Sequence, residues 1–184
     1  MTVRVVGGAA RGRALKVAPG KSTRPSSSRV RSALFSMLAP DLPGSSILDL
    51  YAGTGALGIE ALSRGAARAD FVEHLPRQCA MISENLEALG LIAKARVYKM
   101  SVEAACLSLS GPYEVILMDP PYSELAKVPD LNKVSRLLRN DGVIVLEHGK
   151  RYDPPGATAD LRQLQGRVYG DTALAMYRKG APSQ

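Results

Sequence analysis

The sequence predicts one α/β domain built on a mostly parallel sheet of seven strands, with helices on both faces and a β-hairpin and a helix at the N-terminus. Between residues 46 and 149, short apolar runs of strand length alternate with amphipathic segments of helical length, a pattern typical of parallel sheets with helical crossovers. A glycine-rich turn follows the first apolar run, where sheets of this kind bind ligands. The 184 residues suffice for one well-formed core and are too few for two large domains.

The first 40 residues predict a β-hairpin and a helix. Residues 3–7 and 14–17 have the composition of two short strands around the segment GGAARGR. A loop over residues 21–28 follows. A helix is expected from about Ser27 to Leu38, because the apolar residues of this segment recur at helical spacing on one face. These residues are Val30, Leu34, Met37 and Leu38.

The core elements alternate after a linker rich in proline, glycine and serine at residues 40–45. Five strands are predicted, at residues 46–50, 67–73, 95–100, 113–119 and 142–148. Helices are predicted at residues 56–64, at residues 76–89, and from residue 131 to the segment Asn140-Asp141-Gly142. A closing β-hairpin over residues 161–178, with Gly170 and Asp171 near its turn, completes the seven-stranded sheet. The parallel crossovers should be right-handed.

The composition is that of a globular protein without a membrane span. Hydrophobic residues make up 46% of the chain and charged residues 22%, which is ordinary for a soluble domain. No window approaches the roughly 18 apolar residues of a membrane span, and the N-terminus lacks an apolar run of signal-peptide length. Cys79 and Cys106 have no CxxC spacing, so we expect reduced thiols in a cytoplasmic protein. His74 and His148 form no Cys/His cluster, which argues against a metal site.

The positive charge is concentrated in the N-terminal arm, residues 1–40. The net charge is +7, and this arm holds eight basic residues and no acid, whereas the rest of the chain is close to neutral. A solubilising tail is one interpretation of such a segment. The basic residues of this arm, however, alternate with Gly, Val and Leu in segments that are predicted to be structured. We therefore predict a surface that binds a polyanion.

A glycine pattern lies between a predicted strand and a predicted helix, in the segment DLYAGTGALG of residues 49–58. Gly53, Gly55 and Gly58 satisfy the pattern G-x-G-x-x-G. Glu73 follows about 20 residues later, where dinucleotide-binding domains hold an acid on the ribose. By this pattern alone, a dinucleotide site is possible, and so is a tight turn with a purely structural role.

Asp49, in the strand before the glycines, favours a positively charged ligand. Its carboxylate adds negative charge where the pyrophosphate of NAD would otherwise approach. S-adenosylmethionine carries a sulfonium and an ammonium group and no phosphate, so we predict it as the cofactor, with Glu73 on both ribose hydroxyls. A surface acid at a strand end is the alternative role of Glu73. The residues expected to line the cofactor are Asp49, Tyr51, Ala52, Gly53, Thr54, Gly55, Glu73 and Asp119.

The segment DPPY, residues 119–122, ends the fourth predicted strand and predicts a site for an exocyclic amine. Two consecutive prolines stiffen the loop and leave its carbonyls as free acceptors. The Asp119 carboxylate and the Pro120 carbonyl could then accept two N–H bonds of an amino group, while Tyr122 stacks on a flat base. These acceptors would stabilise the positive charge that grows on the nitrogen during attack on a methyl group. An aspartate is too weak a base to deprotonate a neutral amine beforehand, so the proton should leave with or after the methyl transfer. A Pro-Pro turn that merely ends a strand is the alternative.

These residues together resemble an amino-directed class I S-adenosylmethionine-dependent methyltransferase with a Rossmann-like fold. A closer resemblance, to the bacterial 16S rRNA guanine-N2 methyltransferases of the RsmD type, covers nearly the whole chain. The matching stretches are RVVGGAARGRALKV, RPSSSRVRSALF, DLYAGTGALGIEALSRGA, the FVE that ends at Glu73, the helix with Asn85, DPPY and VYGDTALAMY.

The resemblance implies methyl transfer to the N2 amine of one guanine of 16S rRNA, the guanine conventionally numbered 966. The partner would be 16S rRNA within an assembled or assembling small subunit, bound by a monomeric enzyme. Residues 1–184 would form a single methyltransferase domain, in which residues 1–40 face the RNA and residues 41–184 bind the cofactor and catalyse transfer. Asp119, Pro120 and Tyr122 are the implied catalytic residues. The arginines expected to contact phosphates are Arg11, Arg13, Arg24, Arg29 and Arg31.

Two departures from the family pattern stand out. Serines replace the usual threonine, two acids and an asparagine of the N-terminal motif; these are Ser26, Ser28, Ser32 and Ser36. Where related enzymes often hold an acid on the adenine amine, this chain has Ser101 and Val102, whose hydroxyl and backbone N–H could serve instead. The alternative functions are a DNA or RNA adenine-N6 methyltransferase, a protein glutamine methyltransferase and a non-catalytic module that binds a nucleotide or RNA. Glu147 and His148, at the end of the fifth core strand, receive no assignment.

Overall fold

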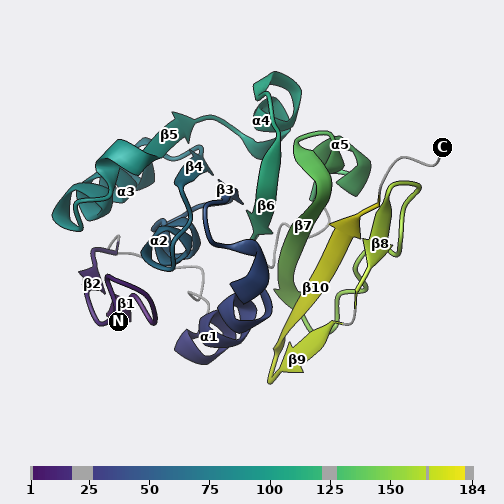
Figure 1. Cartoon of the computed structure of the whole chain (residues 1–184), viewed down its shortest axis with the longest axis horizontal. Coiled ribbons are helices and arrows are strands. Elements are labelled where there is room, and N and C mark those ends of the chain that lie inside the picture. Colours follow the sequence, from purple (N-terminus) through teal and green to yellow (C-terminus); the bar gives the residue numbers. More distant parts are fainter. Residues whose placement is uncertain (1, 18–26, 122–127, 165, 181–184) are drawn as a thin grey trace.

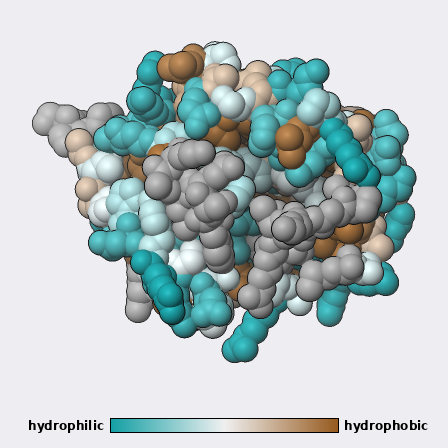
Figure 2. All heavy atoms as spheres, turned by 180° about the vertical axis from the view of Figure 1, so that it is seen from behind, coloured by the Kyte–Doolittle hydropathy of each residue, from teal (hydrophilic) through white to brown (hydrophobic). Residues whose placement is uncertain are grey.

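The computed structural model describes residues 2–17, 27–121, 128–164 and 166–180 (Figure 1). Two of the predicted site residues, Arg24 and Tyr122, lie outside the described residues, as does most of the predicted loop over residues 21–28. Within the described ranges, no helix is both long enough and apolar enough to cross a membrane. Hydrophilic residues cover most of what can be seen on the side opposite to Figure 1, and hydrophobic residues appear there in separate patches (Figure 2).

The centre of the molecule is the predicted, mostly parallel sheet. Its strands are β3 (Ser46–Leu50), β4 (Arg68–Glu73), β5 (Ala95–Lys99), β6 (Tyr113–Met118), β7 (Leu138–Gly149), β8 (Leu161–Gln163), β9 (Arg167–Tyr169) and β10 (Thr172–Lys179). Their order across the sheet is β5-β4-β3-β6-β7-β10-β8, and β9 also pairs with β10. The pairs from β5 to β7 are parallel, whereas β7 and β10 are antiparallel. The predicted closing hairpin is therefore confirmed, with its first arm divided into β8 and β9.

Helices cover both faces of this sheet, as predicted. The helices α1 (Ser28–Met37), α2 (Ala56–Ser63) and α3 (Pro76–Ala88) pack their apolar residues into one cluster with one face of the strands. The helices α4 (Val102–Ser108) and α5 (Leu131–Ser135) pack into a second cluster on the other face. Two short 3₁₀ helices, η1 (Ala39–Asp41) and η2 (Ile92–Lys94), precede β3 and β5. We call the side covered by α1, α2 and α3 the first face, because the site described below lies on it, and the side covered by α4 and α5 the second face. The apolar clusters on these two sides are the first-face cluster and the second-face cluster.

The N-terminal hairpin is a separate two-stranded sheet of β1 (Val3–Arg4) and β2 (Ala14–Leu15), in antiparallel register. It lies beside α2 (Figure 1). The hydroxyl of Ser63 donates to the Gly7 carbonyl at 2.6 Å and accepts from the Ala10 N–H at 2.9 Å. Gly8 has a φ of +75°, and a Cβ there would lie 1.9 Å from the Ser63 carbonyl oxygen. Glycine is therefore required for the hairpin to approach α2 this closely.

Asn85 of α3 connects the hairpin to the glycine turn. Its side-chain oxygen accepts from the Lys16 N–H at 2.8 Å, and its amide nitrogen donates to the carbonyls of Lys16, at 3.1 Å, and Thr54, at 3.2 Å. The Asn85 side chain is 2% exposed, so these bonds are shielded from water. The N-terminal hairpin is thus held to the core beside the predicted cofactor-binding turn.

One predicted helix is wrong, and one helix of the structure was not predicted. The predicted helix from residue 131 to residues 140–142 is wrong, because α5 ends at Ser135 and β7 already begins at Leu138. Leu138 pairs with Tyr113 of β6, so sheet pairing overrides the helical spacing of the leucines. Asp141, with a φ of 61°, lies within β7 rather than at a helix end. The helix α4 was not predicted; it is short, and Ser101 caps its N-terminus by accepting from the Ala104 N–H at 3.2 Å.

Candidate functional site

Four acidic residues stand at the carboxyl ends of four neighbouring strands, all directed to the first face of the sheet. They are Glu73 of β4, Asp49 of β3, Asp119 immediately after β6 and Glu147 of β7. Each follows by two positions an apolar residue of the first-face cluster, these being Phe71, Ile47, Leu117 and Val145. Side chains two positions apart on a strand point to the same face of the sheet. Each acid therefore continues the line of first-face side chains on its own strand and lies just beyond the apolar core. We call these four residues the acid row.

The register of the strands brings the members of the acid row close together. Met118 lies beside Leu50 of β3 and beside Leu146 of β7, so the next residue, Asp119, follows directly next to Glu147. Asp49, Glu73 and Glu147 are buried, and Asp119 is half-buried. Burying several carboxylates side by side is unfavourable unless cations or N–H donors compensate them.

The glycine turn between β3 and α2 is built from residues in left-handed conformations. Gly53 and Gly55 have φ values of 55° and 77°, and Tyr51 has a φ of 65° although it is not a glycine. Gly55 caps α2, and a Cβ there would lie 3.2 Å from a methyl group of Ile82 on α3. The Ala52 N–H donates to the Val72 carbonyl at 3.0 Å, which fixes the turn against the end of β4. A strained tyrosine at this place is typical of a functional site.

Glu73 holds the glycine turn through its carboxylate. One oxygen accepts from the Gly53 N–H at 3.0 Å and the other from the Leu75 N–H at 2.8 Å. Gln78 of α3 can donate from its amide nitrogen to the same Glu73 carboxylate at 3.1 Å and to the Gly53 carbonyl at 3.2 Å. The predicted ribose acid therefore lies against the predicted glycine turn, although these residues are 20 positions apart in sequence.

Asp49 is the most deeply buried member of the acid row. Its Oδ2 accepts from the Gly58 N–H of α2 at 2.8 Å, whereas its Oδ1 has no hydrogen-bond partner among the residues described. Burial raises the pKa of Asp49 to about 8 against the opposing effect of the Gly58 hydrogen bond, and the nearby charges of Asp119 and Glu73 add to the rise. A buried oxygen without a partner, in an ionisable group, fits a ligand that supplies a cationic donor.

The other residues predicted at the site lie around this centre. Pro120 is buried directly after Asp119. The Met100 N–H donates to the Glu73 carbonyl at 3.1 Å, which places Ser101 and Val102 just beyond the end of β4. The Ser101 hydroxyl accepts from the Ala104 N–H, as already noted, and Val102 is buried in the second-face cluster. Three members of the acid row were predicted site residues, and the structure brings all three together.

The position of Arg31 differs from the one that the sequence predicted. It was predicted to contact phosphates, but only 4% of it is exposed, so it does not belong to the outer surface. Its Nη2 donates to the Arg4 carbonyl at 2.8 Å. Burial lowers the pKa of Arg31, and the nearby carboxylates of Glu60, Glu147 and Asp119 act in the opposite direction. Arg31 thus places a positive charge beside the acid row.

Other arginines of the N-terminal arm are exposed, unlike the buried Arg31. Arg11, Arg13 and Arg29 are exposed, and Arg13 donates to the Ala88 carbonyl of α3 at 2.9 Å. Counting charges along the sequence could not separate these arginines from the buried one. Glu147 was left unassigned, although its position two residues after an apolar strand residue matches that of Asp49, Glu73 and Asp119 and could have identified it.

The comparisons with known proteins cover almost the whole chain. The family model described as "Conserved hypothetical protein 95" matches residues 3–178. A relative from Bacillus subtilis, "Putative rRNA methyltransferase YlbH", is 38% identical over 183 residues, which is 96% of this chain and 99% of the relative. "Ribosomal RNA small subunit methyltransferase D" of Escherichia coli is 31% identical over 184 residues, covering 99% of this chain and 92% of the relative.

Solved structures show the same fold. A putative methyltransferase of Escherichia coli, yhhF, superposes with a TM-score of 0.85 at 30% identity, covering 98% of this chain and 99% of the other. A hypothetical protein of Thermus thermophilus superposes with a TM-score of 0.81 at 36% identity, covering 95% of this chain and 98% of the other. The fold is that of the class I methyltransferases. The chain therefore belongs to the family described as Conserved hypothetical protein 95, the RsmD family of methyltransferases.

Proposed function

We propose that the protein transfers a methyl group from S-adenosylmethionine to the N2 amine of one guanine of 16S rRNA, the guanine conventionally numbered 966. The observation that carries this proposal is the acid row, which combines a buried carboxylate oxygen of Asp49 that has no partner in the described parts of the chain with Asp119 at the start of the DPP loop. The names of the relatives, which refer to rRNA and to the small ribosomal subunit, support the choice of substrate.

The cofactor would be held by the glycine turn and its two flanking acids. S-adenosylmethionine supplies an electrophilic methyl group on a sulfonium centre. The ammonium group of its methionine moiety is a cationic donor of the kind that the free Asp49 Oδ1 lacks. Glu73 would accept from the ribose hydroxyls with the acceptor capacity that remains after its bonds to the Gly53 and Leu75 N–H groups. Residues of α4, beginning at the Ser101 cap, would border the adenine.

Asp119 and Pro120 would orient the acceptor amine. The Asp119 carboxylate and the Pro120 carbonyl accept its two N–H bonds, which directs the nitrogen lone pair towards the methyl group. As the carbon–sulfur bond breaks and the carbon–nitrogen bond forms, positive charge develops on the nitrogen, and these acceptors stabilise it. The nitrogen then loses a proton to the Asp119 carboxylate and from there to water, which restores the neutral amine and leaves S-adenosylhomocysteine as the other product. Tyr122, outside the described residues, would stack on the guanine.

Arg31 would keep the acid row in its working state. Its positive charge acts on the carboxylates of Glu147 and Asp119 and offsets the repulsion between them. The same side chain is bonded to the Arg4 carbonyl in the N-terminal hairpin. We therefore assign Arg31 a positioning role that connects the hairpin to the acceptor loop, in place of a phosphate contact.

The exposed arginines of the N-terminal arm would hold the RNA backbone. Arg11, Arg13 and Arg29 are exposed on the hairpin and on α1, and contacts of this kind position a nucleic acid without reading its sequence. The target guanine has to leave its stack to reach the Asp119 loop, at a cost of a few kcal/mol that is smaller in a loop than in a duplex. A single-stranded or loop guanine is therefore the favoured target.

The experiment that tests this function is a methyl-transfer assay with labelled S-adenosylmethionine on small subunits and on naked 16S rRNA that lack the modification. The proposal predicts incorporation of label into rRNA, and the better of the two substrates shows whether ribosomal proteins present the base. Thermal unfolding provides a matched test of the cofactor, because the ligand that binds the folded state raises the melting temperature. Stabilisation by NAD but not by S-adenosylmethionine, or label only in protein, would refute the proposal.

A further inference from the structure

A concave site lies away from the acid row, at the amino ends of β4, β5 and β6. This pocket has a volume of about 330 Å³ and is lined by Arg68, Lys94, Arg96, Asp70, Tyr98, Tyr113 and Ser110, among others. Arg68 and Tyr113 begin β4 and β6, and Lys94 directly precedes β5. The acid row stands at the opposite, carboxyl ends of the strands. The pocket is therefore distinct from the proposed methyl-transfer site.

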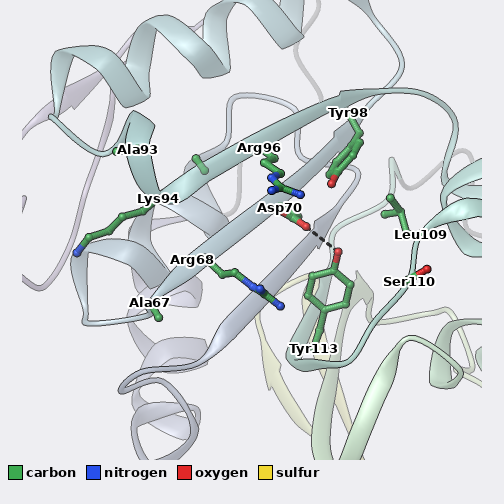
Figure 3. A pocket seen from close by; sticks show the side chains of 11 residues that line it. Ala67, Arg68, Asp70, Ala93, Lys94, Arg96, Tyr98, Leu109, Ser110 and Tyr113 are labelled. Atoms are coloured by element: carbon green, nitrogen blue, oxygen red, sulfur yellow. Dashed lines mark hydrogen bonds between the residues drawn. The ribbon is translucent and has the colours of Figure 1, made fainter.

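The pocket opens on the second face of the sheet, near its edge. Asp70 pairs in register with Arg96, and Val72 pairs with Tyr98. Val72 belongs to the second-face cluster, so the side chains of Asp70, Arg96 and Tyr98 project from the same face. The residues Leu109 and Ser110, which follow α4, close another side of the pocket. Figure 3 shows Arg68 and Arg96 extending towards Asp70 and Tyr113, while Lys94 extends outwards.

Three cations line this pocket, and two of them, Arg68 and Arg96, extend towards one acid, Asp70. Arg68, Lys94 and Arg96 are exposed, whereas Asp70 is only 8% exposed. The Asp70 carboxylate accepts a hydrogen bond from the Tyr113 hydroxyl at 2.7 Å. Among the described residues, no ion pair within 4 Å joins Asp70 to either arginine, or engages Lys94. Tyr98, through a hydrogen bond, and Asp70, through its charge, raise the pKa of Arg96, and the three cations still outnumber the one acid.

This arrangement fits a ligand with a negative charge at its rim and hydroxyl groups deeper in the pocket. This excess of positive charge attracts an anion. Arginine and lysine are the side chains that bind phosphate oxygens most readily. The hydroxyls of Tyr98, Tyr113 and Ser110 offer donors and acceptors to a sugar. The volume falls at the lower end of the roughly 300–1,000 Å³ range of small-molecule sites, which is more than a bare phosphate ion fills.

We propose that the pocket between the amino ends of β4, β5 and β6 binds a ribose-phosphate unit of a nucleic acid. In the RNA substrate it holds a segment of backbone away from the target base, and this part rests on the proposed function. Arg68 and Arg96 bind the phosphate, Lys94 adds positive charge at the rim, and the buried Asp70–Tyr113 pair forms the floor on which the sugar lies. The protein then grips its RNA at two places, the N-terminal arm and this pocket.

The first arm of the test uses uridine 5′-monophosphate as the probe, because it carries a ribose-phosphate and lacks the adenine that the cofactor site would accept. Its binding is followed by the backbone amide NMR signals of the whole protein. We expect shifts that saturate at millimolar concentrations and centre on Ala69, Ala95 and Ser110, and their loss in the double variant Arg68→Gln/Arg96→Gln. Shifts confined to the acid row and the glycine turn, or none at all, would overturn the assignment of the pocket.

The second arm measures binding of an RNA fragment of the small-subunit rRNA as a function of salt. Each phosphate contact contributes about 0.7 to 0.9 to the slope of log K against log salt, so the double variant should lower the slope by roughly 1. The variant Arg162→Gln/Arg167→Gln is the matched control, since it removes the same charge from exposed positions on β8 and β9. An equal decrease in this control, or none in the pocket variant, would overturn the RNA assignment and leave a free nucleotide as the ligand.

Methyl transfer separates failure of this proposal from failure of the proposed function. The pocket variant should keep the transfer rate at saturating RNA and raise the RNA concentration needed for half-maximal rate. A wild-type protein that methylates no rRNA would refute the proposed function. The NMR shifts caused by uridine 5′-monophosphate would still show whether the pocket binds a ribose-phosphate. A pocket variant that lowers the saturating rate alone would contradict a role in RNA holding.

Discussion

At the scale of single residues, the proposed methyl transfer depends on two carboxylates, Asp49 and Asp119, that differ in burial. Asp49 is sealed between β3 and α2 and has one oxygen without a partner among the described residues, whereas Asp119 is half-buried at the start of a rigid loop. Burial disfavours the charged form of Asp49, and a cationic ligand restores it. One carboxylate is thus suited to binding the methyl donor and the other to orienting the acceptor.

Replacing Asp119 separates binding from transfer. We expect Asp119→Ala to lower the methyl-transfer rate by roughly 10²- to 10³-fold, because a positioned acceptor that acts in the transition state is worth that much. Binding of S-adenosylmethionine should change little, since Asp119 lies at the edge of the cofactor site. Single-turnover transfer and calorimetric titration measure the two effects, with the exposed Asp153→Ala as control. A fully active variant would refute the role of Asp119.

Cofactor binding should release a proton from Asp49. The pKa of Asp49 is about 8 without ligand, so at pH 7 the group is mostly protonated, and a cationic donor beside it favours the ionised form. The raised pKa also means that Asp49 makes the folded state less stable as the pH rises from its unfolded value through about 8. Titration calorimetry at pH 7 in buffers of different ionisation enthalpy counts the proton. Asp49→Asn should abolish the release, and an equal release in that variant would contradict the assignment.

At the scale of elements, the N-terminal arm and the catalytic core are joined by a few buried polar side chains. Asn85 bonds the end of the hairpin to the glycine turn, and Arg31 of α1 is bonded to β1 while its charge acts on the acid row. In Figure 1, α1 lies near the ends of β6 and β7 where the acid row stands. The arm that we propose to bind RNA is thereby held in a fixed position relative to the Asp119 loop.

Asn85→Ala should loosen the arm. The substitution removes three buried hydrogen bonds and leaves the backbone groups of Lys16 unpaired, which should lower the free energy of unfolding by roughly 1–3 kcal/mol. Urea denaturation measures the loss, and limited proteolysis within the first 20 residues should become faster. Glu87→Ala, exposed on the same helix, is the control. An Asn85 variant as stable and as resistant as the Glu87 variant would show that these bonds do not hold the arm.

Arg31 should matter for the rate of transfer through its charge. Arg31→Met removes the cation that offsets the repulsion between Glu147 and Asp119, so the acid row should hold its geometry less well and the transfer rate should fall about tenfold or more. Arg31→Lys keeps the charge and should preserve most of the rate. Single-turnover transfer by the two variants tests this, and urea denaturation compares their stability. A lysine variant as slow as the methionine variant would contradict a role for the charge of Arg31.

At the scale of the whole molecule, most of the fold follows from local patterns, and the site follows from combining them. Apolar runs that end at or near Asp49, Glu73 and Asp119 predicted the strands. They also predicted these three of the four residues of the acid row. The spacing of Leu131, Val134, Leu137 and Leu138 predicted a helix that sheet pairing cuts short, because the register of β7 against β6 is a tertiary effect. Arg31 was misassigned since its burial depends on how α1 packs.

The arm should account for part of the electrostatic attraction of the RNA. Neutralising Arg11 and Arg13 together should weaken RNA binding and reduce the slope of log K against log salt by roughly 1.4 to 1.8, if each contacts one phosphate. Fluorescence titration of an rRNA fragment at several salt concentrations measures the slope, with the pair Arg162→Gln/Arg167→Gln as the charge-matched control. An unchanged slope would remove both arginines from the RNA footprint.

The measurement that tests the central claim most directly is the identity of the methylated nucleoside. Unmodified small subunits are treated with the protein and S-adenosylmethionine, and the digested rRNA is analysed by mass spectrometry, with the Asp119→Ala variant as the blank. The account predicts N2-methylguanosine at a single position with the wild-type protein and almost none with the variant. Label in N6-methyladenosine, or N2-methylguanosine formed equally by both proteins, would contradict it.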